Sequence, residues 1–245
     1  MSAQPDRWFQ RSVECRELRQ VLVAFPHAGG SAGFFRDWAT QLPGADVLAV
    51  RYPGRAERID EPPPADMVRL GRDIADALGE LLADTDVPLT LFGHSMGAVV
   101  ALETARALEE LGVRPAHLIV SGSRAGPLPE VAPPTELEAD ELALRLAALG
   151  GTDAAMLDDP FFRELVLPYI RSDGEMFHAY RHRREPVLHC PVTAVVGADD
   201  TDADQRPWPE LTTAGFREHV VAGHHFYLVD EPPYELLRNA LAVTR

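Results

Sequence analysis

Lysine is absent from this sequence, and cysteine is scarce. All 23 Lys and Arg positions are arginine, against 38 Asp and Glu, which gives a formal net charge of −15. Such a chain repels the phosphates of nucleic acids and the anionic surface of a membrane, so neither is expected as a partner. The two cysteines, Cys15 and Cys190, are far apart and form neither a disulfide framework nor a metal-binding spacing. Because Cys190 precedes an apolar run, we expect it to be a buried thiol.

Long hydrophobic runs are also missing. No stretch reaches the length of a transmembrane helix, and the opening residues MSAQPDRWFQRS show no apolar segment or cleavage pattern of a secretory signal. We therefore expect a cytoplasmic protein. The 46% hydrophobic and 25% charged residues are typical of a folded chain rather than a disordered one. A length of 245 residues suits one domain with a substantial core.

Short, continuously apolar runs alternate with stretches of helical pattern. The runs have the character of strands that are covered on both faces, and they lie at 21–26, 46–53, 88–93, 117–122 and 191–197. The helical stretches lie at 31–42, 66–82, 95–111 and 231–243. This alternation predicts βαβ crossovers, and hence an α/β fold with a mostly parallel central sheet flanked by helices.

One connection is far longer than the others. Roughly seventy residues separate the strand ending near 122 from the strand starting near 191, whereas most connections take a few residues. Two stretches within it, 139–149 and 159–183, have helical patterns, and the second is rich in large apolar residues. We expect a helical cap or lid at about 125–187, inserted into a single domain that spans 1–245. The alternative is that these apolar residues only complete the core.

A possible nucleophile lies in GHSMG at 93–97, which fits the pattern G-x-S-x-G. The bare pattern arises by chance in about one chain in ten of this length. Here an apolar strand precedes it and a helix follows it, which is the setting of a nucleophile elbow. Gly93 and Gly97 would then avoid steric clashes at a sharp turn, and Ser95 would have a strained backbone at a helix N-terminus. The alternative is an ordinary serine between two glycines.

Serine is a weak nucleophile without a base, and in this fold the histidine follows the acid in the chain. GHHF at 223–226 offers two histidines late in the sequence, of which we prefer His225 to His224. The acid is expected where the strand 191–197 ends, in GADD. We prefer Asp200 there, with Asp199 as the alternative. A solvated acidic turn accounts for the next two carboxylates, Asp202 and Asp204.

A tetrahedral intermediate needs two oxyanion donors. One is the backbone N–H after the nucleophile, that of Met96, and the other is expected from the glycine-rich loop FPHAGGSAG at 25–33, at Ala28. No metal site is expected. His27 has no ligand partner at a suitable spacing, and His178 and His182 lack a third ligand.

Several motifs together resemble the type II thioesterases, which are stand-alone α/β-hydrolases accompanying polyketide and nonribosomal peptide synthases. They are FPHAGGSA, RYPGR (51–55), LFGHSMGA, LPYIRSD (167–173), GADD and GHHFYL, and the resemblance runs from about Trp8 to the final helix. It implies an α/β-hydrolase fold in which Ser95, Asp200 and His225 form a catalytic triad. It also implies an oxyanion hole made by Ala28 and Met96.

The same resemblance implies an activity. The enzyme would hydrolyse acyl thioesters on the phosphopantetheine arm of acyl or peptidyl carrier proteins, would remove aberrant acyl groups, and would need no cofactor. The sequence departs from the family at Thr201, where proline is frequent, and at His224, where glycine is usual. No carboxylate occurs at 120–129, where thioesterase domains built into synthases usually have their acid, so the later acid is typical of the stand-alone proteins.

A carrier protein is usually acidic, as this chain is, so a locally basic docking surface is expected. The densest basic cluster is YRHRREP at 180–186, and we predict that Arg181, Arg183 and Arg184 face the carrier. The alternative is a solvated helix end that suits the helix dipole. Two other functions stay open: a carboxylester hydrolase or lipase with the same triad, and a non-catalytic scaffold of the same fold that only binds a partner.

Overall fold

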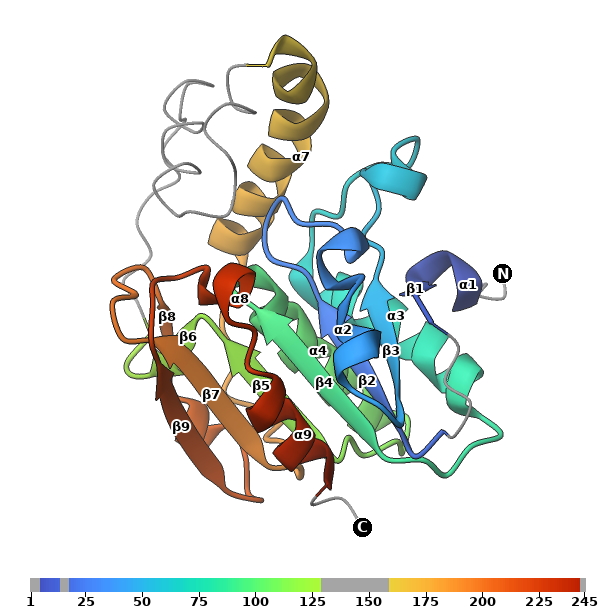
Figure 1. Cartoon of the computed structure of the whole chain (residues 1–245), viewed down its shortest axis with the longest axis vertical. Coiled ribbons are helices and arrows are strands. Elements are labelled where there is room, and N and C mark those ends of the chain that lie inside the picture. The colour runs from blue at the N-terminus through green and yellow to red at the C-terminus, as the bar shows by residue number, and fades with distance from the viewer. Residues whose placement is uncertain (1–4, 14–17, 129–158, 243–245) are drawn as a thin grey trace.

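The computed structural model describes residues 5–13, 18–128 and 159–242. A seven-stranded sheet forms its centre, in the order β1-β3-β2-β4-β5-β7-β9 (Figure 1). The strands are β1 (Phe9–Arg11), β2 (Gln20–Phe25), β3 (Ala45–Val50), β4 (Leu89–His94), β5 (His117–Ser121), β7 (Val192–Gly197) and β9 (Phe216–Val221). Only β1 pairs antiparallel, with β3, and every other pair in this sheet is parallel. The predicted mostly parallel sheet is confirmed.

Parallel pairing brings the carboxyl ends of the strands to one edge. Phe25 of β2 lies opposite Gly93 of β4, and His94 lies opposite Ser121 of β5. In the next pair, Ser121 lies opposite Val195 of β7. The loops that leave β2, β4, β5 and β7 therefore start side by side. A small second sheet pairs β6 (Ser123–Ala125) with β8 (Asp204–Arg206) near this edge.

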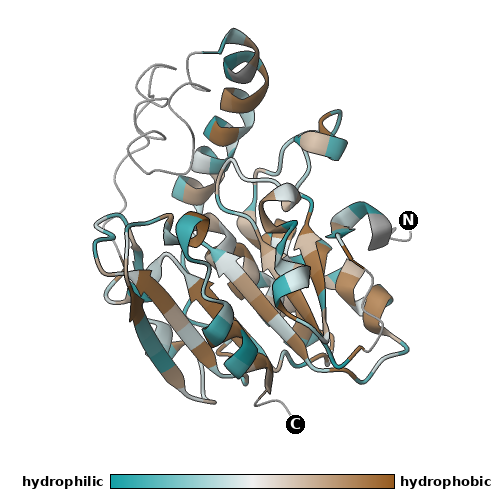
Figure 2. Cartoon of the chain, viewed as in Figure 1, coloured by the Kyte–Doolittle hydropathy of each residue, from teal (hydrophilic) through white to brown (hydrophobic). Residues whose placement is uncertain are grey.

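Helices cover both faces of the sheet (Figure 1). One core cluster packs α3 (Met67–Leu82) and α4 (Met96–Glu110) against the strands, and a second includes α2 (Trp38–Gln41) and α9 (Tyr234–Ala242). Apart from α7, the other described helices are short: α1 (Pro5–Trp8), α8 (Tyr227–Asp230) and the 3-10 turns η1 (Ala32–Phe35), η2 (Ala56–Arg58) and η3 (Trp208–Glu210). Figure 2 shows the result as apolar central strands between helices with a polar outer side.

Local signals explain where α3 begins and where α4 ends. The Asp66 carboxylate accepts a hydrogen bond from the Arg69 N–H at 2.8 Å, which caps α3. Gly112, with φ of 82°, follows α4 and ends it. The predicted helices at 66–82 and 95–111 are confirmed. Among the described helices, none has both the length and the apolar composition that crossing a bilayer requires.

The single helix predicted at 31–42 is wrong. The segment instead forms η1 and the short α2, separated by Arg36 and Asp37. Aromatic packing explains the break, because Phe35 and Trp38 stack edge to face and both contact Phe92 of β4. Burying these rings against the sheet outweighs continuation of one regular helix.

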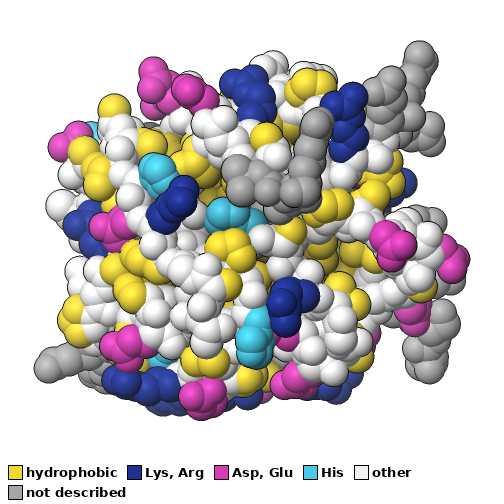
Figure 3. Space-filling model, turned by 90° about the horizontal axis from the view of Figure 1, so that it is seen from below, with side chains coloured by type: hydrophobic (Ala, Val, Ile, Leu, Met, Phe, Trp, Pro, Cys, Tyr) yellow, Lys and Arg dark blue, Asp and Glu magenta, His cyan; other side chains and the backbone are white. Residues whose placement is uncertain are grey.

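Both edge strands escaped the sequence analysis. β1 has only three residues, and β9 (FREHVV) carries polar side chains that are exposed along most of its length. Figure 2 shows this hydrophilic character in the middle of β9. Polar side chains are usual on edge strands, where they discourage pairing with another chain. Seen from below, at the end of the sheet away from α7, acidic, basic and hydrophobic side chains are interspersed (Figure 3).

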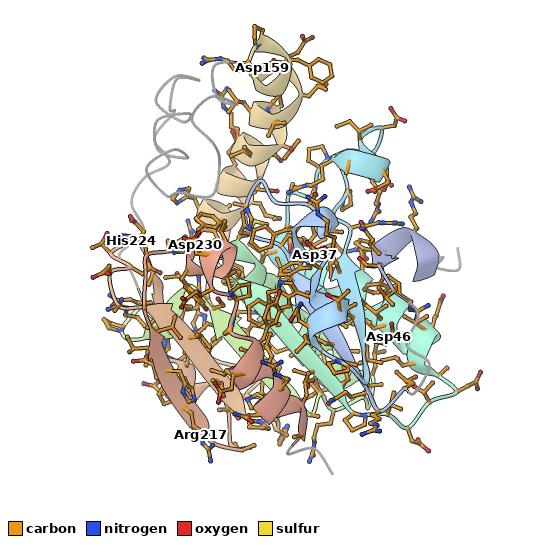
Figure 4. The ribbon with its side chains drawn as sticks, viewed as in Figure 1. Asp37, Asp46, Asp159, Arg217, His224 and Asp230 are labelled. Atoms are coloured by element: carbon orange, nitrogen blue, oxygen red, sulfur yellow. The ribbon has the colours of Figure 1, made fainter. Side chains whose placement is uncertain are left out.

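Helix α7 (Pro160–Ala179) rises above the carboxyl edge of the sheet (Figure 1). Its first turn starts where the Phe161 N–H donates to the Asp159 carboxylate at 2.8 Å, far from the sheet (Figure 4). Phe161 is 70% exposed, whereas Ile170 and Met176, further along, are buried. The predicted helix at 139–149 lies outside the described residues, so the lid at about 125–187 and the single domain over 1–245 stay predictions.

Candidate active site

Ser95 occupies a sharp turn between β4 and α4. Its φ of 55° and ψ of −121° lie in a region that residues other than glycine rarely adopt. The turn is held because the Ser95 N–H donates to the Ser121 carbonyl at 2.8 Å. The Ser95 side chain makes no capping hydrogen bond to α4. The predicted strand–turn–helix with a strained serine is therefore present.

Two glycines make this turn possible. A Cβ atom on Gly93 would lie 2.1 Å from the Gly97 carbonyl oxygen, and one on Gly97 would lie 2.2 Å from the Phe25 carbonyl oxygen. Both neighbours are backbone atoms, which cannot move aside without displacing β2 or α4. The sequence-based reason for these glycines, a steric one, is confirmed.

A buried acid–base pair lies at the same edge of the sheet. Asp200 follows β7 and His225 follows β9, and the distance from His225 Nδ1 to Asp200 Oδ2 is 2.9 Å. The other carboxylate oxygen, Oδ1, accepts from the Asp202 N–H at 3.0 Å. Arg124 donates to the Asp200 main-chain carbonyl at 2.8 Å. The carboxylate is thus held in one orientation toward the imidazole.

The two alternatives from the sequence are not brought to this pair. Asp199 and His224 are both exposed, and His224 Nδ1 lies 3.3 Å from the Asp199 carbonyl oxygen. His224 lies at the periphery of the molecule, on the loop that follows β9 (Figure 4). The structure therefore joins the two preferred residues, Asp200 and His225.

The solvated turn expected at Asp202 and Asp204 holds only for the first. Asp202 is exposed, but the Asp204 carboxylate pairs with Arg206 Nε at 2.6 Å, and these two side chains are 10% and 6% exposed. The expectation for Asp204 is wrong because residues 204–206 form β8, which pairs with β6. Burial raises the pKa of Asp204 despite the neighbouring guanidinium.

His225 lies beside the elbow. Its ring packs against the ring of His94, the residue before Ser95, with 5.0 Å between centroids. A Cβ atom on Gly122 would approach His94 Cε1 to 2.8 Å and His225 Cε1 to 3.0 Å, so both rings crowd the same glycine. Among the described residues, no hydrogen bond joins the Ser95 hydroxyl to His225, so a direct Ser–His contact belongs to the proposed mechanism.

A polar chain behind the histidine was missed by the sequence analysis. His94 Nδ1 lies 2.9 Å from the Ser121 hydroxyl, which lies 2.6 Å from the Tyr227 hydroxyl. Burial is the main cause of the low pKa of His94, far below its usual value, and of the raised pKa of Tyr227. The only sequence signal was position: Ser121 ends a predicted strand, and Tyr227 comes two residues after His225.

The glycine-rich loop after β2 passes over the first turn of α4. Within it the Gly30 N–H donates to the His27 carbonyl at 2.9 Å, and the Gly29 N–H donates to the Asp173 carboxylate at 2.8 Å. Among the described residues, the N–H groups of Ala28 and Met96 have no hydrogen-bond acceptor. Two amides at the shared edge of β2 and β4 are thus free to bind an anion.

His27 forms an apolar wall of the site. Its ring packs edge to face between Phe34 and Phe226, at centroid distances of 5.0 and 4.7 Å. Burial, reinforced by the nearby His225 and Arg55, lowers the pKa of His27 to about 3, so this ring is neutral at pH 7. No cluster of three or more possible metal ligands occurs in the described ranges, and this includes His27, His178 and His182.

The predicted docking arginines are largely engaged within the chain. Arg183 pairs with the buried Glu103 of α4, and Arg184 pairs with Glu210 at 2.8 Å. Arg181 donates to the His178 carbonyl at the end of α7. Burial lowers the pKa of Arg183, but the hydrogen bond and charge of Glu103, with other nearby charges, outweigh burial, so the pKa is raised and the charged form is favoured. The cluster is therefore partly neutralised, and carrier contact by these residues stays a prediction.

Comparison with known proteins places this geometry in context. Residues 20–242 match the model of the thioesterase domain. Thioesterase PikA5 of Streptomyces venezuelae is 38% identical over 232 residues, which are 91% of this chain and 81% of PikA5. LgrE of Brevibacillus parabrevis, which bears the name linear gramicidin dehydrogenase, is 34% identical over 236 residues, or 93% of this chain and 89% of LgrE. The structure of the type II thioesterase BorB, from the borrelidin biosynthetic cluster, matches with a TM-score of 0.81 and 35% identity, over 96% of this chain and 98% of BorB.

Proposed function

Because this chain belongs to the thioesterase family and is a type II thioesterase of the α/β-hydrolase fold, we propose that it releases acyl groups from carrier proteins by acyl transfer to Ser95. The family membership makes it a thioester hydrolase of polyketide or nonribosomal peptide biosynthesis. The observation that carries the catalytic part is the buried pair of Asp200 and His225, at 2.9 Å, beside the strained Ser95.

In the proposed mechanism, the Ser95 oxygen attacks the thioester carbonyl while His225 Nε2 takes the hydroxyl proton. Asp200 accepts the hydrogen bond from His225 Nδ1–H, which leaves Nε2 free to act as the base. The tetrahedral oxyanion is bound by the N–H groups of Ala28 and Met96. Its collapse breaks the C–S bond, and the leaving thiolate takes the proton from His225. Water then attacks the acyl-serine by the same steps and releases the acid.

The chemistry of the site fits a thioester substrate. Thiols are more acidic than alcohols, so the thiolate leaves readily and little protonation by His225 is needed at that step. The neutral His27, with Phe34 and Phe226, gives the acyl group an apolar wall. No cofactor enters any step. The position of α7 above this edge supports the predicted lid over the site of the acyl group (Figure 1). That lid is predicted to span about 125–187.

The partner in this proposal is an acyl or peptidyl carrier protein, and the role is editing: removal of stalled or wrong acyl groups. The basic cluster at the end of α7 offers a sharp test of docking. All three arginines are exposed, but Arg183 is tied to the buried Glu103, so its reversal would disturb the core. Arg184 pairs with the exposed Glu210, and Arg181 donates to a backbone carbonyl. Arg181→Glu with Arg184→Glu should slow hydrolysis of carrier-bound substrate and spare a small thioester. Equal effects on both substrates would contradict a role of these arginines in docking.

The substrate class is tested by rates on a matched panel. Purified protein is given one acyl group as a carrier-bound thioester, a free pantetheine thioester and an oxoester, with Ser95→Ala as control. We expect the carrier-bound thioester to be hydrolysed fastest and the control to be inactive. Faster cleavage of the oxoester would favour a carboxylester hydrolase. No hydrolysis of any of the three would favour a binding scaffold, and the proposal would fail.

A further inference from the structure

A buried ion pair joins α7 to the loop between β3 and η2. Asp173, on α7, is 0% exposed, and Arg55, in the RYPGR segment, is 2% exposed. The guanidinium contacts both carboxylate oxygens, at 2.6 Å from Nη1 to Oδ2 and 2.5 Å from Nη2 to Oδ1. This two-point geometry is the one that a guanidinium makes best, because its donors form a rigid fork. Neither residue belongs to the acid–base pair described above.

The same two side chains also bind the glycine-rich loop. Asp173 Oδ2 accepts from the Gly29 N–H at 2.8 Å, and Arg55 Nη1 donates to the Gly30 carbonyl at 3.2 Å. These two backbone groups directly follow Ala28 in the chain. The ion pair thus holds one N–H and one carbonyl of the loop, both directly after Ala28, whose N–H is the proposed oxyanion donor.

Close packing supports these contacts on both sides. A Cβ atom on Gly29 would lie 2.6 Å from Ile170 Cγ1, so α7 touches the loop backbone and only glycine fits there, with φ of 77°. The guanidinium of Arg55 also lies over two aromatic rings, Tyr52 at 5.2 Å and Tyr169 at 4.9 Å. The loop, the RYPGR segment and α7 therefore meet in one buried junction.

We propose that Arg55 and Asp173 are positioning residues for the oxyanion hole, and that through them α7 holds the Ala28 N–H in the orientation that binds the tetrahedral intermediate. The inference rests on the proposed function, because it takes Ala28 as an oxyanion donor. A free loop rich in glycine would have many orientations, and its N–H would have to be reoriented during each reaction. A donor held in place in advance needs no such reorganisation.

A buried ion pair adds little to the stability of a fold, because the cost of removing both charges from water offsets much of their attraction. Here both charges also bind backbone groups of the loop, since Asp173 accepts from the Gly29 N–H and Arg55 donates to the Gly30 carbonyl. We therefore expect removal of the pair to lower kcat by more than it changes KM.

The experiment uses three variants of the full chain and a small acyl thioester. Arg55→Met with Asp173→Leu replaces the pair by apolar side chains of similar shape, which generally preserves folding. Arg55→Lys keeps one charge contact but lacks the fork. Glu103→Gln is the matched control. Glu103 is a buried carboxylate of α4 that accepts from Tyr180, the residue after α7, at 2.6 Å and from Arg106 of α4 at 2.7 Å, away from the loop.

For each variant, kcat, KM and the affinity for a trifluoromethyl ketone analogue are measured. The analogue forms a tetrahedral oxyanion on a serine nucleophile. We expect the double variant to lose about 10- to 100-fold in kcat and a matching factor in analogue affinity, with KM nearly unchanged. Arg55→Lys should show an intermediate loss, and Glu103→Gln should keep the wild-type kcat.

Other outcomes overturn the proposal. Wild-type kcat in either Arg55 variant, or a loss confined to KM, would mean that the pair only stabilises the fold or the acyl site. Equal losses in Glu103→Gln would mean the same. Ser95→Ala separates this failure from failure of the proposed function, since retained hydrolysis in that variant would refute the function whatever the Arg55 variants do. If the double variant fails to fold, Arg55→Lys decides.

Discussion

Replacing Asp200 by asparagine tests the acid–base pair with almost no change in shape. In the native site Asp200 Oδ1 accepts from the Asp202 N–H at 3.0 Å, and Oδ2 faces His225 Nδ1 at 2.9 Å. The new side-chain amide has one oxygen and one NH2 group. The Asp202 N–H needs an acceptor, so the oxygen is expected to stay at the Oδ1 position. The NH2 group must then face His225 Nδ1.

An NH2 group at this point donates a hydrogen bond where the carboxylate accepted one. His225 Nδ1 then has to be an acceptor, which moves the ring proton to Nε2, the atom that should receive the proton of Ser95. In this wrong tautomer the ring cannot act as the base. We expect kcat of Asp200→Asn to fall about 10³- to 10⁴-fold, which corresponds to roughly 4–5.5 kcal/mol of transition-state stabilisation.

The assay is steady-state hydrolysis of a small acyl thioester, with unfolding curves to establish that the variant is folded. Asp199→Asn is the matched control, because Asp199 is adjacent, exposed and not in contact with His225. It should keep kcat within about twofold of the wild type. A loss of less than about tenfold in Asp200→Asn, or an equal loss in the control, would refute this assignment of the acid.

Three further predictions follow from buried groups. Gly97→Ala should disrupt the elbow and abolish activity, because its Cβ would lie 2.2 Å from the Phe25 carbonyl oxygen; near-native rates and melting temperature would contradict this. The pKa of His27 falls to about 3 in the folded state, below the unfolded value of 6.5, so stability that is complete above pH 6.5 is lost as the pH falls toward 3. Between pH 7 and pH 5 this loss is about 2 kcal/mol, and chemical denaturation of His27→Phe should lack that share of the pH dependence. Burial raises the pKa of the Cys190 thiol to about 12. Peptide mapping after iodoacetamide treatment at pH 7.5 should therefore find Cys190 unmodified in the native protein and modified in denaturant. Modification in the native state would argue against its burial.

Features with a local cause could be predicted from the sequence. The elbow is of this kind, because the strand, the glycine spacing and the helix of residues 88–111 are contiguous and their steric logic is local. The preference for Asp200 and His225 rested on chain order and on the ends of strands, and parallel pairing brings those ends together. The regular geometry of a parallel sheet is therefore the reason that Asp200 and His225 lie together.

Features that depend on remote partners could not be predicted in this way. Arg55 and Asp173 lie 118 positions apart, and no periodicity connects them. Nothing in the sequence around Arg183 indicated that Glu103, 80 positions away, binds it; carrier contact by Arg183 stays a prediction. A cluster of like charges in the sequence says nothing about the opposite charges that the fold brings to it. The break in the helix predicted at 31–42 has the same origin, in rings that pack on a distant strand.

The central claim is that Ser95 is the nucleophile, and mass spectrometry of the trapped enzyme tests it most directly. The native protein is treated with a fluorophosphonate, and separately quenched in acid during turnover of a slow acyl thioester, and both samples are digested and mapped. The account predicts a phosphonyl group and an acyl group on the peptide that contains Ser95, and neither on Ser95→Ala. Modification of a different residue, or none at all in an enzyme that still turns over, would contradict it.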